Sequence, residues 1–207
     1  MTQLLLIRHA QNEWVKSGKL AGWTPGIHLN EEGKRQAEAL GRRLASVKFA
    51  ALYSSPLERA VETAEAVARH HEGLQVRIDE GVGEVRYGGW TGGRIIQLAR
   101  TRLWKVVQGY PSGARFPDGE SFLEVQFRLI SAIERIAAQH PGGRVAVVAH
   151  GDVIKLAVAH FAGMHLDLFQ RLVVEPASIS VIQMRRFGPL IVRLNDVAHC
   201  EQVLNAE

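Results

Sequence analysis

The chain has 207 residues, of which 46% are hydrophobic and 22% are charged, a composition that excludes disordered and fibrous proteins. Its 25 Lys and Arg residues slightly outnumber its 21 Asp and Glu residues, and the net charge of +4 is spread along the chain, which favours a small anionic ligand over nucleic acid. The single cysteine, Cys200, excludes an internal disulfide framework and favours a cytoplasmic location. No apolar run reaches the roughly 20 residues of a membrane helix, so we expect no membrane contact.

The first predicted elements are a strand over 3–8 and a helix that begins after Asn30. The apolar residues of 3–8 run consecutively, which is typical of a strand covered on both faces. Asn30 is a good N-cap residue, and the helix after it has an apolar face made of Ala37, Leu40, Gly41 and Leu44. A second, short strand is predicted over 50–54.

A helix is predicted directly after this second strand. Ser55-Pro56-Leu57-Glu58 combines a capping box with a proline at the first helical position, so the helix should begin there. A third strand over 76–79 then leads into the glycine-rich stretch 81–93. A further helix is predicted over 95–107, and 109–119 is predicted to be a loop.

The last third of the chain repeats this alternation. Ser121-Phe122-Leu123-Glu124 is a second capping box, and an apolar stripe at helical spacing follows it as far as the turn at 141–143. The elements predicted after that turn are a strand over 144–149, a helix from Gly151 to Gly163, and closing strands over 178–184 and 191–194. Strands that alternate with helices predict an α/β fold with a largely parallel sheet.

Charged and polar side chains follow three of the predicted strands. Arg8 and His9 close the first strand, 54–59 links the second strand to its helix, and His150 closes the strand over 144–149. In open α/β sheets, ligands bind beyond the carboxyl ends of the strands, so these residues should share one rim. Arginine forks and helix N-terminal amides at one rim indicate a site for an anion, and the arginine fork matches phosphate geometry.

Six short segments, taken in chain order, resemble the motifs of one known family. They are LIRHAQNEW (6–14), LNEEG (29–33), SSPLERA (54–60), EVRYGGWTG (84–92), DGES (118–121) and AHG (149–151). Together they resemble the histidine phosphatase superfamily, in its phosphoglycerate mutase-like branch. The resemblance implies a three-layer α/β/α sandwich with a largely parallel mixed sheet. It also implies a single domain over 1–207, with a short lid-like insertion around 92–119.

The resemblance also implies roles for individual residues. His9 would attack phosphorus and form a phosphohistidine, and Arg8, Arg59 and His150 would bind the phosphoryl oxygens. Glu84 would be the acid that protonates the leaving group, so the implied catalytic residues are His9, Glu84 and His150. Because phosphoryl transfer depends mainly on positioning and on charge stabilisation, we expect neither a metal ion nor a cofactor.

The protonation state of Glu84 can be considered from its neighbours. Two arginines beside the carboxylate should lower its pKa in the empty enzyme, and a bound dianionic phosphate should offset their field and raise it. We therefore predict that substrate binding loads the acid with its proton.

The substrate pocket is predicted less directly, because it comes from loops. Its candidate residues are Gln11, Trp23, Arg86 and Tyr87. An apolar part that receives the leaving group is expected from the aromatic loop residues Trp14, Trp23, Tyr110 and Phe116.

Two departures from the family pattern lie close to the predicted chemistry. Ala10 stands where the family usually has glycine, a tolerable change if its φ is negative. Val15 stands where many members have an asparagine that holds the phosphate or the substrate, which weakens a mutase role. The segment 92–119 is also compact and lacks the basic, extended insertion of the mutases. We therefore predict a phosphatase that acts on phosphate monoesters of small metabolites, with mutase-type phosphoryl transfer as the alternative.

Other classes fit the sequence less well. Cys200 lacks the glycine-rich loop and arginine of a cysteine phosphatase, and no H-E-x-x-H motif indicates a metal site. The arginines form no stripe with interleaved aromatics, so we expect no nucleic-acid partner. A phosphoanion-binding regulatory module without turnover stays open as the non-enzyme alternative. A homodimer is expected from the family alone.

Overall fold

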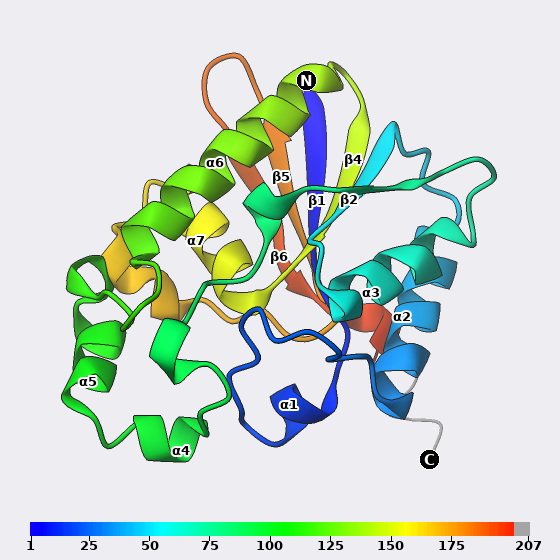
Figure 1. Ribbon diagram of the computed structural model, residues 1–207. Helices are drawn as coiled ribbons and strands as arrows, with labels where there is room; N and C mark the ends of the chain where they lie inside the picture. The colour runs from blue at the N-terminus through cyan, green and yellow to red at the C-terminus, as the bar shows by residue number, and fades with distance from the viewer. Residues whose placement is uncertain (201–207) are drawn as a thin grey trace.

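A six-stranded sheet forms the centre of the molecule in the computed structural model, which describes residues 1–200 (Figure 1). Its strands are β1 (Thr2–Arg8), β2 (Ala51–Ser54), β3 (Val76–Ile78), β4 (Arg144–Ala149), β5 (Ile179–Met184) and β6 (Leu190–Asp196). They lie in the order β3-β2-β4-β1-β5-β6, and β5 pairs antiparallel with both of its neighbours while the pairs among the first four are parallel. The predicted α/β fold with a mixed, mostly parallel sheet is therefore confirmed.

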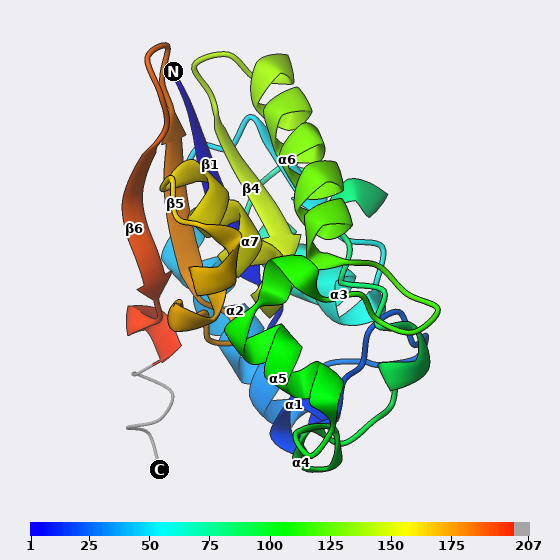
Figure 2. The ribbon, with the colours of Figure 1, turned by 90° about the vertical axis from the view of Figure 1, so that its left-hand side faces the viewer.

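The helices cover both faces of this sheet (Figures 1 and 2). They are α1 (Glu13–Lys16), α2 (Glu31–Leu44), α3 (Glu58–Ala68), α4 (Ile95–Leu98), α5 (Arg102–Gly109), α6 (Phe122–Gln139) and α7 (Gly151–Phe161). Short 3₁₀ helices lie at 80–82, 88–90, 111–113 and 166–171.

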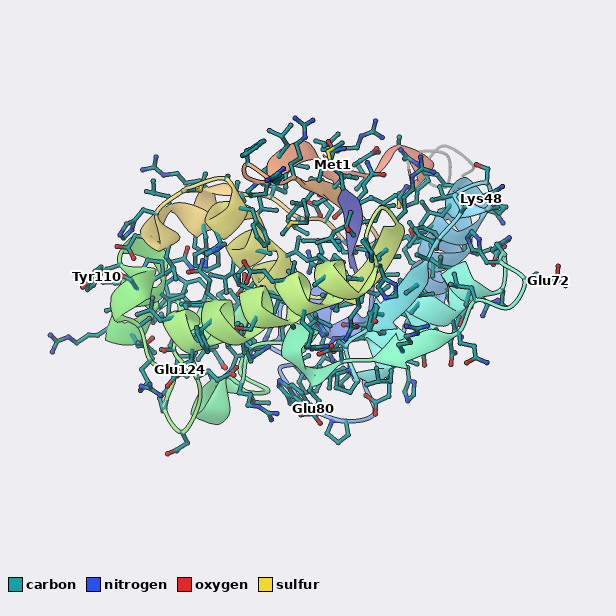
Figure 3. All side chains as sticks on the ribbon, turned by 90° about the horizontal axis from the view of Figure 1, so that it is seen from above. Met1, Lys48, Glu72, Glu80, Tyr110 and Glu124 are labelled. Carbon is teal, nitrogen blue, oxygen red and sulfur yellow. The ribbon has the colours of Figure 1, made fainter. Side chains whose placement is uncertain are left out.

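The alternation of side chains along β1 divides the core into two layers. Leu5 and Ile7 pack with the apolar faces of α2 and α3, whereas Leu4 and Leu6 belong to the larger cluster that includes α6 and α7. Successive side chains of a strand point to opposite faces, so the consecutive apolar run of β1 buries both. Seen from above, Lys48 and Glu72 lie at one end of the molecule and Tyr110 at the other (Figure 3).

Two of the predicted helix caps are confirmed. The Asn30 side chain accepts from the Gly33 amide at 2.8 Å and opens α2. Ser121 and Glu124 form the reciprocal capping box that opens α6. Each cap satisfies amides that the first helical turn would otherwise leave without partners, so both helices begin where the sequence indicates.

Two predicted helix boundaries are wrong. The helix after β2 begins at Glu58 with Leu57 as its N-cap residue, because the Ser55 hydroxyl contacts His150 Nε2 at 2.8 Å instead of capping the helix. The helix predicted over 95–107 is two helices, α4 and α5, because the Thr101 hydroxyl accepts from the Trp104 amide at 3.2 Å and opens a new helix. The short helix α1, capped by Asn12, was not predicted.

The carboxyl ends of β1, β2 and β4 meet at one edge of the sheet, at the lower end of Figure 1. The loops around α1, α4 and α5 gather beside that edge (Figures 1 and 2). Within residues 1–200, no helix is long and apolar enough to cross a bilayer. The domain prediction extends to residue 207, and 201–207 lie outside the described residues.

Candidate active site

Four cationic or imidazole side chains meet at this edge, and we call Arg8, His9, Arg59 and His150 the cationic cradle. Parallel pairing sets Arg8 of β1 opposite Ala149 of β4, so His9 and His150 follow side by side, with ring centroids 5.2 Å apart. Arg59 comes from the first turn of α3, directly after β2. His9, Arg59 and His150 are no more than 3% exposed, so the cradle lies at the base of the site and not on its rim.

The hydrogen bonds of His9 determine which ring nitrogen carries its proton. Nδ1 lies 2.8 Å from the Ala10 carbonyl oxygen, which only accepts, so Nδ1 is the donor. Nε2 is then the unprotonated nitrogen, and its lone pair accepts from Arg59 Nε at 3.3 Å. Burial, and then the charges of Arg59 and Arg8, hold the pKa of His9 well below its usual value. His9 is therefore a neutral imidazole with a nucleophilic Nε2 at neutral pH.

His150 is held in the opposite tautomer. Its Nδ1 lies 3.3 Å from Arg59 Nη2, which only donates, so its Nε2 carries the proton and donates to the Ser55 hydroxyl. Burial and the Arg59 charge lower the pKa of His150 well below its usual value. Ser55 therefore orients one wall of the cradle.

Several buried donors around the cradle have no partner within the described protein. They are Arg8 Nε, Arg59 Nη1 and Asn12 Nδ2. Each guanidinium is held by a main-chain carbonyl: Arg8 Nη1 donates to the Val174 carbonyl at 2.6 Å, and Arg59 Nη2 donates to the Gly22 carbonyl at 2.9 Å. Buried donors are normally satisfied, so three that border one cavity indicate a site for a group rich in acceptor oxygens.

Glu84 lies in the loop after the first 3₁₀ helix and points its carboxyl group toward the cradle. Its Oε1 accepts from the Val85 amide at 2.9 Å, and its Oε2 lies 3.7 Å from His150 Nδ1. Burial, and then the charge of Asp152, raise the pKa of Glu84 to about 7, although Arg59, the Val85 amide and Arg8 act to lower it. The prediction of a lowered pKa in the empty enzyme is therefore wrong, because desolvation of the carboxylate outweighs the two arginines. Glu84 carries its proton for much of the time near neutral pH.

A cavity of about 260 Å³ opens above the cradle. We call its ring-bearing residues the aromatic wall: Tyr87, Trp90, Trp104, Phe116 and Phe122. The Phe116 ring contacts Tyr87, Trp90 and Phe122, and Trp90 stacks on Trp104. The ring centroids of these pairs are 5.0 to 6.1 Å apart. Polar side chains complete the lining, among them Asn12, Lys19, Gln108, Asp152, Lys155 and Gln170. The cavity thus joins a cationic base to a largely aromatic side.

The predicted pocket residues separate in the structure. Tyr87 and Phe116 line the cavity, whereas Gln11, Trp23, Arg86, Trp14 and Tyr110 do not belong to its lining. Gln11 accepts from Asn30 Nδ2 at 3.0 Å, and Trp23 donates to the Glu84 carbonyl at 2.6 Å. The Arg86 guanidinium lies 3.8 Å from the centroid of the Trp23 ring. Trp23 and Arg86 therefore pack against the main chain at Glu84, outside the lining of the cavity.

Several lining residues were not predicted. Asp152 follows His150 by two positions and accepts from the Tyr87 hydroxyl at 3.0 Å, so its place near the strand end was a usable signal. Lys155 lies one turn further along α7, 3.7 Å from Asp152 Oδ1. Trp90 and Trp104 gave no such signal, because their place in the lining depends on how the chain folds between the 3₁₀ helix at 88–90 and α6. Among residues 1–200, no group of three or more His, Cys, Asp or Glu side chains is arranged to hold a metal ion.

Both departures from the family pattern have defined surroundings. Ala10 is fully buried, and its amide donates to the Thr63 hydroxyl at 3.0 Å. In the described part of the chain, the non-glycine residues with positive φ are Asp118, Ala177 and Asn195, so Ala10 has the negative φ that a methyl side chain requires. Val15 lines the cavity and gives it an apolar surface at that point.

The fold and the site together define an α/β protein with a buried, cationic site at the carboxyl edge of its sheet. The chain belongs to the histidine phosphatase superfamily (branch 1), which it matches over residues 4–197. The relative phosphoserine phosphatase 1 of Hydrogenobacter thermophilus is 30% identical over 204 residues, 96% of this chain and 94% of that protein. A probable phosphoglycerate mutase GpmB of Cronobacter sakazakii is 28% identical over 209 residues, 97% of this chain and 96% of that protein. The Entamoeba histolytica phosphoserine phosphatase, solved in complex with 3-phosphoglyceric acid, superposes with a TM-score of 0.88 at 26% identity and covers 97% of this chain and 100% of that one.

Proposed function

We propose that the protein hydrolyses phosphate monoesters of small metabolites through a phosphohistidine on Nε2 of His9. One observation carries this proposal: a buried, neutral imidazole presents an unprotonated Nε2, which accepts from Arg59 Nε at 3.3 Å, beside guanidinium and amide donors that lack partners. A nucleophile surrounded by fixed cations is the arrangement that phosphoryl transfer requires.

In the first step, His9 Nε2 attacks phosphorus, and the bond between phosphorus and the ester oxygen breaks. Arg8, Arg59 and Asn12 donate to the phosphoryl oxygens, where negative charge is concentrated. The departing alkoxide takes the proton of Glu84, whose pKa near 7 suits a general acid at neutral pH.

In the second step, water attacks phosphorus and the bond between phosphorus and Nε2 breaks. Glu84, now a carboxylate, accepts the proton of the attacking water, which returns the acid to its starting state. Inorganic phosphate leaves, and His9 is again neutral. The same carboxyl group therefore serves both half-reactions.

Hydrolysis differs from a mutase reaction in the acceptor of the phosphoryl group. The segment 92–119 contributes Ile95, Trp104 and Phe116 to the cavity, and its side chains there are mainly apolar. An apolar cover accommodates one leaving group but offers few charges to hold a second phosphate. This supports the phosphatase, with the segment as a lid, over the mutase alternative that the relative GpmB represents.

Hydrolysis of p-nitrophenyl phosphate in EDTA tests the proposal. The wild-type protein and the control His160→Ala, which changes an exposed histidine of α7, should both be active. His9→Ala should lose activity by about 10³-fold or more, because the nucleophile is missing. Rapid quenching in base should trap a phosphorylated wild-type protein, whose phosphoryl group is stable in base and is lost in acid. A folded His9→Ala variant with full activity would contradict the proposed nucleophile.

A panel of phosphorylated metabolites distinguishes the two reactions. Each is incubated with the enzyme, with and without a bisphosphorylated primer, and both inorganic phosphate and isomerised product are measured. Phosphate release should exceed isomerisation for every compound. Isomerisation that outruns phosphate release would establish the mutase reaction instead. Tight binding of phosphate esters with no turnover would establish the regulatory module.

A further inference from the structure

Arg128 of α6 grips the main chain of the loop that carries Glu84. Its Nη1 donates to the carbonyl oxygens of Gly81 and Gly83 at 3.1 and 2.9 Å, and its Nη2 donates to the Glu84 carbonyl at 2.8 Å. Nη2 and Nε also bond both carboxylate oxygens of Glu120, at 3.0 and 2.7 Å. All five N–H donors of the guanidinium are therefore used, three of them on this loop.

Trp23 holds the same carbonyl from a second direction. Its Nε1 donates to the Glu84 carbonyl oxygen at 2.6 Å. The ring lies so close to the loop that a Cβ atom on Gly83 would meet Trp23 Cζ2 at 2.5 Å. Arg86 covers the ring, 3.8 Å from its centroid. Two donors from separate parts of the chain thus converge on one carbonyl oxygen.

The hydrogen bonds to the Glu84 carbonyl also fix the Glu84 carboxyl group, because a single peptide bond links the two. The Glu84 carbonyl and the Val85 amide belong to the same peptide bond, which is planar, so fixing the C=O also fixes the N–H. That N–H donates to Glu84 Oε1 at 2.9 Å. Oε1 is thereby held at the loop, and Oε2 is the oxygen that faces His150 Nδ1, at 3.7 Å.

We propose that Arg128 and Trp23 are positioning residues that orient the Glu84 carboxyl group by clamping the peptide bond between Glu84 and Val85. The inference rests on the proposed function, because it assumes that Glu84 donates a proton to the leaving group. Neither residue belongs to the lining of the cavity, so both act through Glu84 and do not contact substrate. Seen from above, Glu80 at the start of the loop and Glu124 at the start of α6 lie along the same side of the molecule (Figure 3).

A substitution that keeps the charge of Arg128 but removes its fork tests the clamp. Arg128→Lys retains the positive charge but has three donors on a single nitrogen, which cannot span three carbonyl groups and a carboxylate. The matched control is Arg135→Lys on the same helix, since Arg135 donates to Asp79 at 2.6 Å and is 51% exposed. Trp23→Phe keeps an aromatic side chain, although a smaller one, and removes the Nε1 donor.

The decisive measurement compares two leaving groups. An alkyl phosphate needs a proton from Glu84 as its alkoxide departs, whereas p-nitrophenyl phosphate releases a stable phenolate and needs little help. For Arg128→Lys we expect kcat/KM to fall by about 10- to 100-fold with the alkyl phosphate and by less than about threefold with p-nitrophenyl phosphate. Trp23→Phe should show the same selectivity with a smaller loss, and Arg135→Lys should resemble the wild type with both substrates.

Equal losses with both substrates in Arg128→Lys and Trp23→Phe would overturn the inference, because a merely structural role would not distinguish leaving groups. No loss in either folded variant would also overturn it. If Arg128→Lys does not fold, the selectivity of Trp23→Phe alone decides. Glu84→Gln is measured in parallel: if it spares the alkyl phosphate, the proposed acid fails, and that failure is separate from any result with the clamp variants.

Discussion

The cationic cradle and the aromatic wall border one cavity but are built in different ways. The cradle comes from residues next to strand ends, where the pairing of β1 with β4 and of β4 with β2 fixes their positions. All five residues of the aromatic wall come from 87–122, where short helices and loops follow one another without a strand. Under the proposed function, the sheet therefore positions the residues that act on phosphate, and the loops set the shape of the pocket for the leaving group.

The largest expected effect comes from a conservative change in the cradle. Arg59→Lys keeps a positive charge but loses the fork that contacts His9, His150 and the Gly22 carbonyl. We expect kcat/KM to fall by about 10²- to 10³-fold, as for removal of a preorganised donor at a transition state. Arg35→Lys, on the surface of α2, is the control and should leave kcat/KM unchanged. A loss of less than fivefold would show that the fork is not needed and would blur the division between the two regions.

Replacement of Trp104 in the aromatic wall should separate the two regions. Trp104→Leu should lower kcat/KM for p-nitrophenyl phosphate by about 10-fold, because an apolar contact with the leaving group is lost. The inhibition constant of inorganic phosphate, which has no leaving group, should not change. Trp14→Leu is the control, since Trp14 does not line the cavity. If phosphate inhibition weakened as much as ester hydrolysis, the wall and the cradle would not be independent.

The protonation of Glu84 should appear in stability as well as in activity. Its pKa is raised in the folded protein from 4.5 to about 7, so the folded state binds the proton more tightly than the unfolded state does. Stability from this group is complete below pH 4.5 and is lost as the pH rises through 7. Glu84→Gln cannot ionise, so its free energy of unfolding relative to wild type should rise between pH 4.5 and 8 by up to about 3 kcal/mol.

Urea unfolding at several pH values checks this prediction. His9 and His150, whose pKa values are lowered, cost stability as the pH falls below their unfolded values, but they do so in both proteins and cancel in the difference. A difference that stayed constant across the range would mean that the Glu84 carboxyl group is not desolvated in the folded protein.

The smallest effect is expected far from the phosphate, at the start of α6. Ser121→Ala removes the hydroxyl that accepts from the Glu124 amide, and should lower the free energy of unfolding by about 1 kcal/mol. Because Arg128 lies two turns further along the helix, kcat/KM should remain unchanged. A marked loss of activity would mean that fraying of α6 reaches the Glu84 loop.

The sequence allowed the cradle to be located because its residues lie at or soon after the ends of strands that can be predicted from short segments. Apolar runs that end in Arg8-His9 and in His150 mark strand ends, and parallel strand ends meet at one edge of a sheet. Ser55 shows the limit of local rules: the same hydroxyl satisfies a capping pattern and contacts a distant histidine, and only the folded chain shows which contact forms. At Thr101 a cap was overlooked. The apolar periodicity continues from α4 into α5, so the sequence indicates one helix where the Thr101 hydroxyl begins a second one.

The electrostatics of Glu84 required the structure. The arginines near it in the motifs predicted a lowered pKa, but the burial of the carboxyl group comes from residues spread over the whole chain. Trp23 and Arg86 were predicted to line the pocket. In the structure Trp23 donates to the Glu84 carbonyl, Arg86 covers the Trp23 ring, and neither lines the cavity. Residues that act through another residue have no pattern of their own along the sequence.

The clamp of Arg128 has a consequence for how this family can diverge. It holds the loop by main-chain oxygens, which every amino acid carries, so the side chains at Val82 and Val85 are free of it. Relatives could therefore replace much of the loop and keep the acid in place, provided that an arginine on this helix and a small residue at the position of Gly83 remain. In related sequences we therefore expect the clamp to appear as a few conserved positions far apart along the chain, without a motif in the loop itself.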